Sequence, residues 1–257
     1  MVWWMDVFVA VFGAAVGSFL NVCIWRLPEE RSIVTPRSFC PVCNHPIRFY
    51  DNIPLLSYLL LRGQCRDCQT RIPWRYPLVE GLTGMLAVFL FWKYGASLKF
   101  LVAFLFVASL IVITFIDIDH QIIPDIISLP GIPIFFLAAV FVMKVPFYEA
   151  LWGLLAGGGI LYFIATVYAF LRKQEGMGGG DIKLLAMLGA FLGWKSLIFI
   201  ILISSLTAAI VGITLMVIRG KDMKYAIPFG PFLSLAAIAY IFWGDLFMRA
   251  LFMMHQR

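Results

Sequence analysis

Long apolar runs separated by polar segments dominate the chain. Eight of these runs indicate membrane helices, since one crossing needs about 20 mostly apolar residues. Their expected bounds are 2–25, 78–92, 98–116, 126–143, 148–171, 182–193, 196–218 and 228–251. The sixth run is short for a full crossing and contains Gly189 and Gly193, so we expect it to be tilted, buried among its neighbours or placed in a thinned region of the bilayer. The pattern predicts an all-α polytopic membrane protein with about eight transmembrane helices.

The composition supports this class. Hydrophobic residues make up 62% of the 257 residues, and charged residues make up 13%. A soluble fold of this size could not hide so much apolar surface. A soluble globular domain, a disordered chain and a disulfide-rich secreted scaffold are therefore excluded. The first run lacks a basic start and a small-residue cleavage site, so we expect a retained helix rather than a removable signal peptide.

The basic residues predict an orientation in the lipid bilayer. The net charge of +6 comes from 20 Lys and Arg against 14 Asp and Glu. If the N-terminus lies outside, 14 of the basic residues fall in the cytoplasmic segments 26–77, 117–125, 172–183 and 219–227, and six fall on the opposite side. This split favours both termini outside, and it explains the positive charge without a nucleic-acid partner.

The stretch 26–77 is the only long polar segment. We therefore divide the chain into a first helix at 1–25, a cytoplasmic loop domain at 26–77 and a transmembrane core at 78–257.

Four cysteines in the loop domain have the spacing of a zinc site. Cys40 and Cys43 form one Cys-x-x-Cys pair, and Cys65 and Cys68 form another. Two such pairs can supply the four corners of a tetrahedral Zn²⁺ site, and four thiolates leave no open position, so the ion would be structural. The alternatives are two disulfides or four free thiols, and a cytoplasmic location argues against disulfides. Cys23 lies in an apolar run and is interpreted as a packing residue.

Two acidic clusters lie where apolar runs end or begin, and ionisable groups at such places are candidates for function. The first cluster spans 115–125 and the second spans 176–183. The predicted orientation places both at the cytoplasmic boundary, so Asp117 and Asp181 can meet although they are 64 positions apart. Two carboxylates in one site share a proton, and such a pair can activate water for hydrolysis.

Other catalytic patterns are missing from the sequence. It contains no Gly-x-Ser-x-Gly nucleophile motif, no His-Glu-x-x-His zinc protease motif and no phosphate-binding Gly-Lys-Ser/Thr loop.

Several neighbours of the two aspartates are candidates for supporting roles. They are Asp119, His120, Asp125, Gly178, Gly179, Gly180, Lys183 and Glu80. Simpler interpretations also apply to them. Asp125 can cap the following helix, Asp119 can be solvated in the loop or hold a basic neighbour, and His120 can be a local hydrogen-bond partner. The glycines can allow close approach or act as a hinge, and Glu80 can be an anion in a helix's first turn.

Together, these motifs resemble the prepilin peptidases, or type IV leader peptidases, which are bacterial membrane aspartic proteases of the Gly-x-Gly-Asp kind. The resemblance covers nearly the whole chain in order. The matching motifs are Gly17-Ser-Phe-Leu-Asn-Val22, Arg26-Leu-Pro28, the two Cys pairs, Arg75-Tyr-Pro-Leu-Val-Glu80, Ile116-Asp117-Ile-Asp119-His120, Ile123-Pro124-Asp125 and Gly178-Gly-Gly-Asp181-Ile-Lys183.

The resemblance implies an activity. Such enzymes remove the short basic leader of prepilins and pseudopilins at the cytoplasmic face of the bacterial inner membrane, and their catalytic pair corresponds to Asp117 and Asp181. Many members also methylate the new N-terminal residue, usually Phe, with S-adenosylmethionine, and the long N-terminal loop is the form found in these bifunctional members. No residue of the methyl-donor site is carried over. A peptidase without methyl transfer and a transporter or proton channel with intramembrane carboxylates are the alternatives.

Overall fold

The computed structural model describes residues 3–172, 178–219 and 227–253. Parts of two predicted cytoplasmic segments, 173–177 and 220–226, lie outside the described residues. The chain forms two compact units, residues 1–112 and 113–257. Within the described ranges the structure is helical, with only two isolated β-bridges, so the all-α prediction is confirmed.

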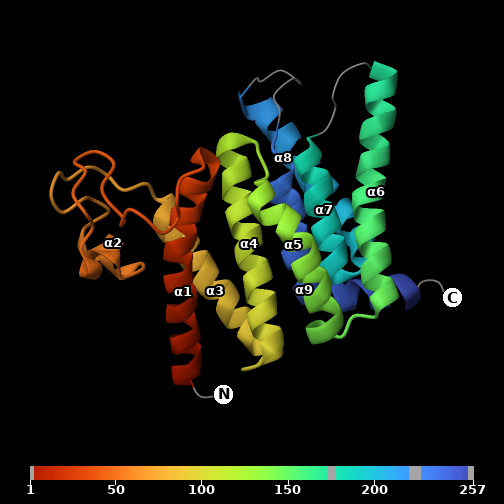
Figure 1. Cartoon of the computed structure of the whole chain (residues 1–257), viewed down its shortest axis with the longest axis horizontal. Helices are drawn as coiled ribbons and strands as arrows, with labels where there is room; N and C mark the ends of the chain where they lie inside the picture. Colours follow the sequence, from red (N-terminus) through yellow and green to blue (C-terminus); the bar gives the residue numbers. More distant parts are fainter. Residues whose placement is uncertain (1–2, 173–177, 220–226, 254–257) are drawn as a thin grey trace. The chain divides into compact units, whose positions relative to one another are not determined.

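The first unit consists of two long helices, a loop region and the start of a third long helix (Figure 1). Its elements are α1 (Trp3–Arg26), the 3-10 helices η1 (Leu27–Glu29) and η2 (Phe49–Asn52), α2 (Leu56–Leu60), α3 (Arg75–Tyr94) and the beginning of α4 (Leu98–His120). Helices α1 and α3 pack closely through small residues, since a Cβ added at Gly13 would lie 2.7 Å from the Cβ of Ala87.

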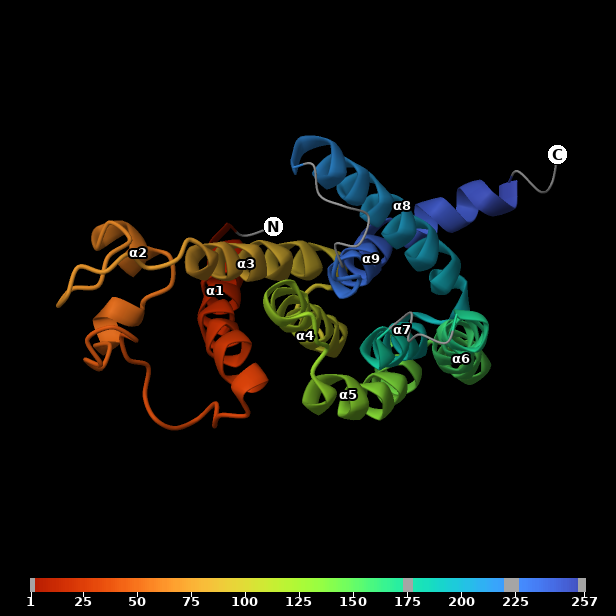
Figure 2. The same ribbon diagram turned by 90° about the horizontal axis from the view of Figure 1, so that it is seen from above.

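The second unit contains the end of α4 and the remaining helices. These are α5 (Asp125–Ala138), the π-helical turn η3 (Ala139–Met143), α6 (Phe147–Arg172), α7 (Gly179–Leu192), α8 (Trp194–Arg219) and α9 (Gly230–Met253). Helix α7 lies beside both α5 and α6 (Figure 2). A Cβ at Gly153 of α6 would overlap the carbonyl of Gly189 in α7, so glycine is required where these two backbones meet.

Helix α7 is the most deeply buried element of the second unit, because every residue from 184 to 191 is buried. Large apolar side chains on the longer helices are instead exposed, and Phe163 of α6 is 68% exposed while Val217 of α8 is 79% exposed. Apolar outer faces of this kind are expected where a helix faces lipid rather than water.

Six of the described helical segments are long and apolar enough to cross a membrane. They are Trp3–Glu29, Leu98–His120, Asp125–Met143, Phe147–Tyr168, Trp194–Ile218 and Gly230–Arg249. Helices also form at the other two predicted positions, but α7 has only 14 residues, and charged and polar residues lower the hydropathy of α3. The expected short sixth segment is therefore confirmed as a buried helix.

Candidate functional site

Asp117 is held near the end of α4 by a backbone group from the start of α9. Its side chain is buried, with 5% exposed, and its Oδ2 accepts a hydrogen bond of 3.0 Å from the N–H of Gly230. A Cβ at Gly230 would lie 2.7 Å from the same oxygen. Glycine at this position therefore lets the backbone donor reach the carboxylate.

Asp181 stands in the first turn of α7, next to the apolar stretch and outside the six long membrane segments. Burial, followed by the negative charge of Asp117, raises the pKa of Asp181 to about 6. The second unit therefore brings the two predicted aspartates close enough for their charges to interact. Such a pair can hold one proton between them and activate water.

The glycines before Asp181 differ in what surrounds them. Gly178 precedes α7 in an extended conformation, and a Cβ at Gly178 or Gly179 would have nothing within 4 Å. A Cβ at Gly180 would lie 2.9 Å from the Cβ of Ile123, in the segment between α4 and α5. Of the three glycines, Gly180 is therefore the one that leaves room for the side chain of Ile123.

Asp125 and Lys183 form an ion pair that joins α5 to α7. The Nζ of Lys183 donates to both carboxylate oxygens of Asp125, at 2.7 and 2.9 Å. The N-cap position of α5 is taken by Pro124 and Asp125 is the first helical residue, so the interpretation of Asp125 as the helix cap is wrong. The pair connects the two acidic clusters directly.

The end of α4 corrects the predicted loop. The apolar run was expected to end at residue 116, but the helix continues to His120. Asp119 therefore lies in the last helical turn rather than in a loop, and its side chain is exposed like that of His120.

Glu80 belongs to the first unit and lies in the second turn of α3, so the interpretation as a first-turn anion is wrong. Its side chain is buried, and its Oε2 accepts a hydrogen bond of 2.8 Å from the N–H of Leu55 in the loop.

The four loop cysteines converge as the spacing predicts. Their sulfur atoms all lie within 4.8 Å of one another, and the Sγ atoms of Cys40 and Cys68 are 3.7 Å apart. A tetrahedral site with Zn–S bonds of about 2.3 Å places its sulfurs about 3.8 Å apart, so the cluster fits a zinc ion. A disulfide needs an S–S distance of about 2.05 Å, and all four cysteines are free thiols here.

The two Cys pairs have the same backbone geometry. In the first pair, the N–H of Asn44 donates to the carbonyl of Cys40 at 2.8 Å, and in the second the N–H of Gln69 donates to Cys65 at 3.0 Å. Asn44 and Gln69 both have positive φ angles, of 58° and 56°. Each turn thereby aims two thiols at one point. Hydrogen bonds from Thr70 lower the pKa of Cys68, whereas, despite the hydrogen bond from the backbone of His45, burial and the neighbouring thiols raise the pKa of Cys43.

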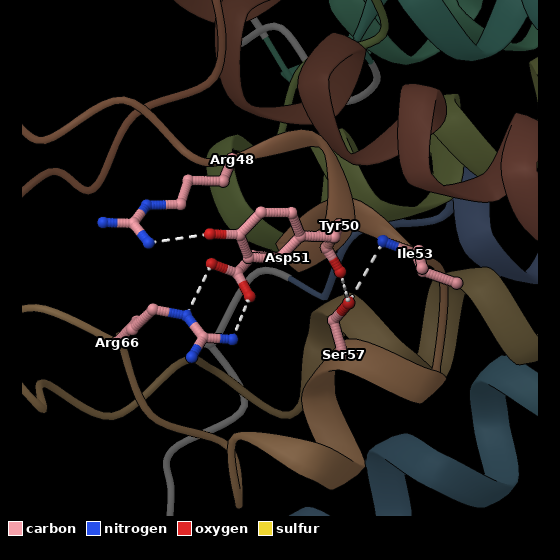
Figure 3. Close-up of polar contacts among 6 residues, drawn as sticks. All are labelled: Arg48, Tyr50, Asp51, Ile53, Ser57 and Arg66. Atoms are coloured by element: carbon pink, nitrogen blue, oxygen red, sulfur yellow. Dashed lines mark hydrogen bonds and ion pairs between the residues drawn. The ribbon is translucent and has the colours of Figure 1, made fainter.

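A polar cluster fixes the segment between the two pairs (Figure 3). The guanidinium of Arg66 donates to both oxygens of Asp51, at 2.8 and 2.6 Å, and lowers the pKa of that carboxyl. The buried hydroxyl of Ser57 donates to the carbonyl of Tyr50 and accepts from the N–H of Ile53.

Sequence reasoning missed Gly230, and it included Asn21 only as part of the motif Gly17-Ser-Phe-Leu-Asn-Val22, without a role. Gly230 acts through its backbone, and the run Pro228-Phe229-Gly230-Pro231 is the signal that could have drawn attention to it. Asn21 is buried in an apolar helix, where a polar side chain is costly without partners. Cys23 is buried in the same helix, as expected of a packing residue.

The fold and the site define an integral membrane protein with a pair of interacting aspartates. The chain belongs to the type IV leader peptidase family, an aspartic protease family: residues 104–213 match that family, and residues 11–94 match the bacterial peptidase A24 N-terminal domain. The chain is thus an enzyme rather than a transporter or channel, and its helices and relatives indicate a multi-pass protein of a bacterial inner membrane.

Curated relatives cover nearly the whole chain. A protein of Pseudomonas putida is 39% identical, and the match covers 91% of this chain and 89% of the relative. A protein of Aeromonas hydrophila is 42% identical, and the match covers 92% of this chain and 90% of the relative. A third relative, from Neisseria gonorrhoeae, is 41% identical, and the match covers 88% of this chain and 86% of the relative. Each is named prepilin leader peptidase/N-methyltransferase. No solved structure matches the chain significantly.

Proposed function

We propose that this enzyme removes the basic leader of type IV prepilins and pseudopilins and then methylates the new N-terminal residue, usually Phe, with S-adenosylmethionine. The observation that carries the peptidase activity is the convergence of both aspartates in one compact unit, since Gly180, next to Asp181, and Gly230, which bonds to Asp117, both lie against Ile123. The names of the relatives support both activities.

Asp117 acts as the base in this proposal. The N–H of Gly230 stabilises negative charge on its Oδ2, so the other carboxylate oxygen can take a proton from water. Asp181 holds the shared proton and polarises the scissile carbonyl. The water oxygen bonds to the carbonyl carbon, the C–N bond breaks, and the amine leaves with the proton from Asp181. The products are a leader with a free carboxyl group and a pilin with a free amine.

The position of the aspartates suits a substrate that spans the membrane. Asp117 stands near the end of a long apolar helix, and Asp181 precedes the apolar part of α7. An apolar prepilin segment would lie among the helices while its Lys and Arg leader stays in the cytoplasm. Cleavage at the cytoplasmic boundary lets water reach the bond more easily than at mid-bilayer.

We further propose that Cys40, Cys43, Cys65 and Cys68 hold a structural Zn²⁺ ion. Their convergence and their matched turns support this assignment. The ion would cross-link the two turns, and four thiolates leave no position for a reacting group.

Cleavage by aspartate variants tests the peptidase proposal. Asp117→Asn and Asp181→Asn should each lower the rate of prepilin cleavage at least about 100-fold, because neither amide can exchange the shared proton. The rate is measured on gels with purified enzyme in detergent. Asp245→Asn is the matched control, since Asp245 is an exposed carboxylate on α9 of the same unit. Normal cleavage by a folded Asp117→Asn or Asp181→Asn variant would refute the assignment.

A further inference from the structure

The first unit contains a cavity of about 400 Å³ between α1, α3 and the loop region. Binding sites for small molecules commonly enclose about 300–1,000 Å³. Aromatic side chains from three segments line this cavity, namely Trp25 of α1, Phe39 and Tyr58 of the loop region, and Tyr76 of α3. Arg48, Asp51, Ser57 and Arg66 of the polar cluster in Figure 3 also line it, so the loop side of the cavity is held in place by hydrogen bonds.

One buried polar atom in the cavity wall lacks a partner. Asn21 is 3% exposed, and its Nδ2 donates a hydrogen bond of 3.1 Å to the carbonyl of Tyr76. Because that carbonyl requires a donor, the bond fixes the orientation of the amide. The Oδ1 of Asn21 has no hydrogen-bond partner. A buried acceptor without a donor is costly, so this atom points to a ligand that carries a donor or a positive charge.

Glu80 adds a negative charge to the same cavity. Its buried carboxylate accepts a hydrogen bond of 2.8 Å from the N–H of Leu55, and Glu80 and Ser18 both line the cavity. Among the residues that the structure describes, no Lys or Arg forms an ion pair with it. A buried carboxylate of this kind favours a cationic ligand.

Arg26 gives the cavity a positive group as well. Its side chain is buried, with 3% exposed, and it donates to the carbonyls of Ser32 and Pro36 at 2.9 and 2.8 Å. A guanidinium has five N–H donors and suits a carboxylate, and no described carboxylate pairs with Arg26. The cavity therefore offers aromatic faces, a cation, and an anion beside a free acceptor.

We propose that this cavity binds S-adenosylmethionine, and this inference rests on the methyl transfer in the proposed function. Arg26 binds the carboxylate of the ligand, and Asn21 and Glu80 accept its positively charged part. The aromatic walls hold the adenine ring, since aromatic side chains stack on bases. In the transfer, the N–C bond to the amine of the pilin would form as the S–CH3 bond of the donor breaks, the methylated nitrogen would release one proton to water, and S-adenosylhomocysteine, whose sulfur is a neutral thioether, would leave.

Equilibrium binding of S-adenosylmethionine to the purified full-length protein tests the proposal. Asn21→Leu and Glu80→Gln should each weaken binding at least about tenfold, as expected for loss of a buried interaction with a charged group. Asn21→Asp keeps an acceptor at this position and should retain binding. Asn21→Leu and Asn21→Asp both lose the hydrogen bond to the carbonyl of Tyr76, so loss of that bond cannot explain a difference between them. Glu29→Gln is the matched control, because Glu29 is an exposed carboxylate of the same unit and is paired with Arg31.

Unchanged affinity in both Asn21→Leu and Glu80→Gln would overturn the proposal. If the affinity is unchanged and both variants raise the KM for the cleaved pilin, the side chains of Asn21 and Glu80 would instead bind the amine of the pilin. A second measurement needs no variant: S-adenosylmethionine cross-linked to the wild-type protein by ultraviolet light should be attached within residues 18–80, where the cavity-lining residues lie. Cross-links confined to residues 113–257 would also overturn it.

Prepilin cleavage by the same wild-type preparation separates the two proposals. Binding of S-adenosylmethionine in the predicted pattern without any cleavage would refute the peptidase function and leave the cavity assignment intact. Cleavage without binding of S-adenosylmethionine would refute the cavity assignment and leave the peptidase intact.

Discussion

The carboxylate of Asp117 depends on a backbone group 113 positions further along the chain. Asp117 and Asp181 could be found from the sequence, because each stands where an apolar run ends or begins. Gly230 could not be found in this way, because its N–H donor leaves no side-chain pattern. The hydrogen bond from Asn21 to Tyr76 could not be predicted for a similar reason, since its acceptor is a backbone carbonyl of another helix.

A methyl group at Gly230 should disturb the site. The added Cβ of Gly230→Ala would lie 2.7 Å from the Oδ2 of Asp117, so the carboxylate or the start of α9 must shift. We expect prepilin cleavage to slow by about 10- to 100-fold, as misplaced catalytic groups commonly cause. Gly159→Ala is the control, because a Cβ there has nothing within 4 Å. Equal rates for the two variants would show that the contact with Gly230 has no role in cleavage.

Asp181 should keep its proton to higher pH than an ordinary aspartic acid. Its pKa of about 6 in the folded protein lies above the usual value of about 3.9. The folded chain thus binds this proton more tightly than the unfolded chain, and ionisation lowers the stability as pH rises from about 4 to about 6. Infrared spectra should show a protonated carboxyl band that titrates near pH 6 and is missing in Asp181→Asn. A midpoint near pH 4 would contradict the burial of this group.

At the scale of elements, the loop region lacks an apolar core of its own. Large apolar side chains in it are exposed, and Phe49 and Leu60 are 88% and 74% exposed. The sequence predicted the two cysteine turns well, because a Cys-x-x-Cys pair is set by a few neighbouring residues. Small regions with little apolar burial commonly depend on a metal for stability, so the Cys cluster should carry much of the loop's stability.

Loss of zinc should loosen this region. Protein purified without chelators should contain about one zinc ion per chain, and Cys40→Ser and Cys68→Ser should lose it, because three thiolates bind it less tightly. Elemental analysis measures the metal, and trypsin should cut faster at the Arg residues of 31–71. Cys23→Ser is the control, since Cys23 is buried in α1 away from the cluster. Zinc retained in both cluster variants would contradict the site.

Helix ends were predicted less well than helix positions. The apolar run ends at residue 116, but nothing after it breaks a helix until the segment before Pro124, so α4 continues to His120. Hydropathy marks where a chain prefers lipid, whereas helix ends depend on backbone hydrogen bonds and caps. The ion pair between Asp125 and Lys183 was not predicted, because it joins two helices far apart in the sequence.

For the whole molecule, hydropathy was sufficient to predict a polytopic membrane protein with helices at eight positions. It could not predict that the chain forms two compact units, because that division depends on contacts between distant segments. It also gave no sign of the cavity, because Asn21 and Arg26 of α1 meet Glu80 of α3 only through contacts between segments far apart in the sequence. The orientation with both termini outside stays a prediction.

A structure of the enzyme with a bound prepilin tests the central claim most directly. We predict that the carboxyl groups of Asp117 and Asp181 will both lie within hydrogen-bond distance, about 2.6–3.2 Å, of one water molecule next to the scissile carbonyl. Carboxyl groups too far apart to share that water, or a scissile bond bound elsewhere in the protein, would contradict the account.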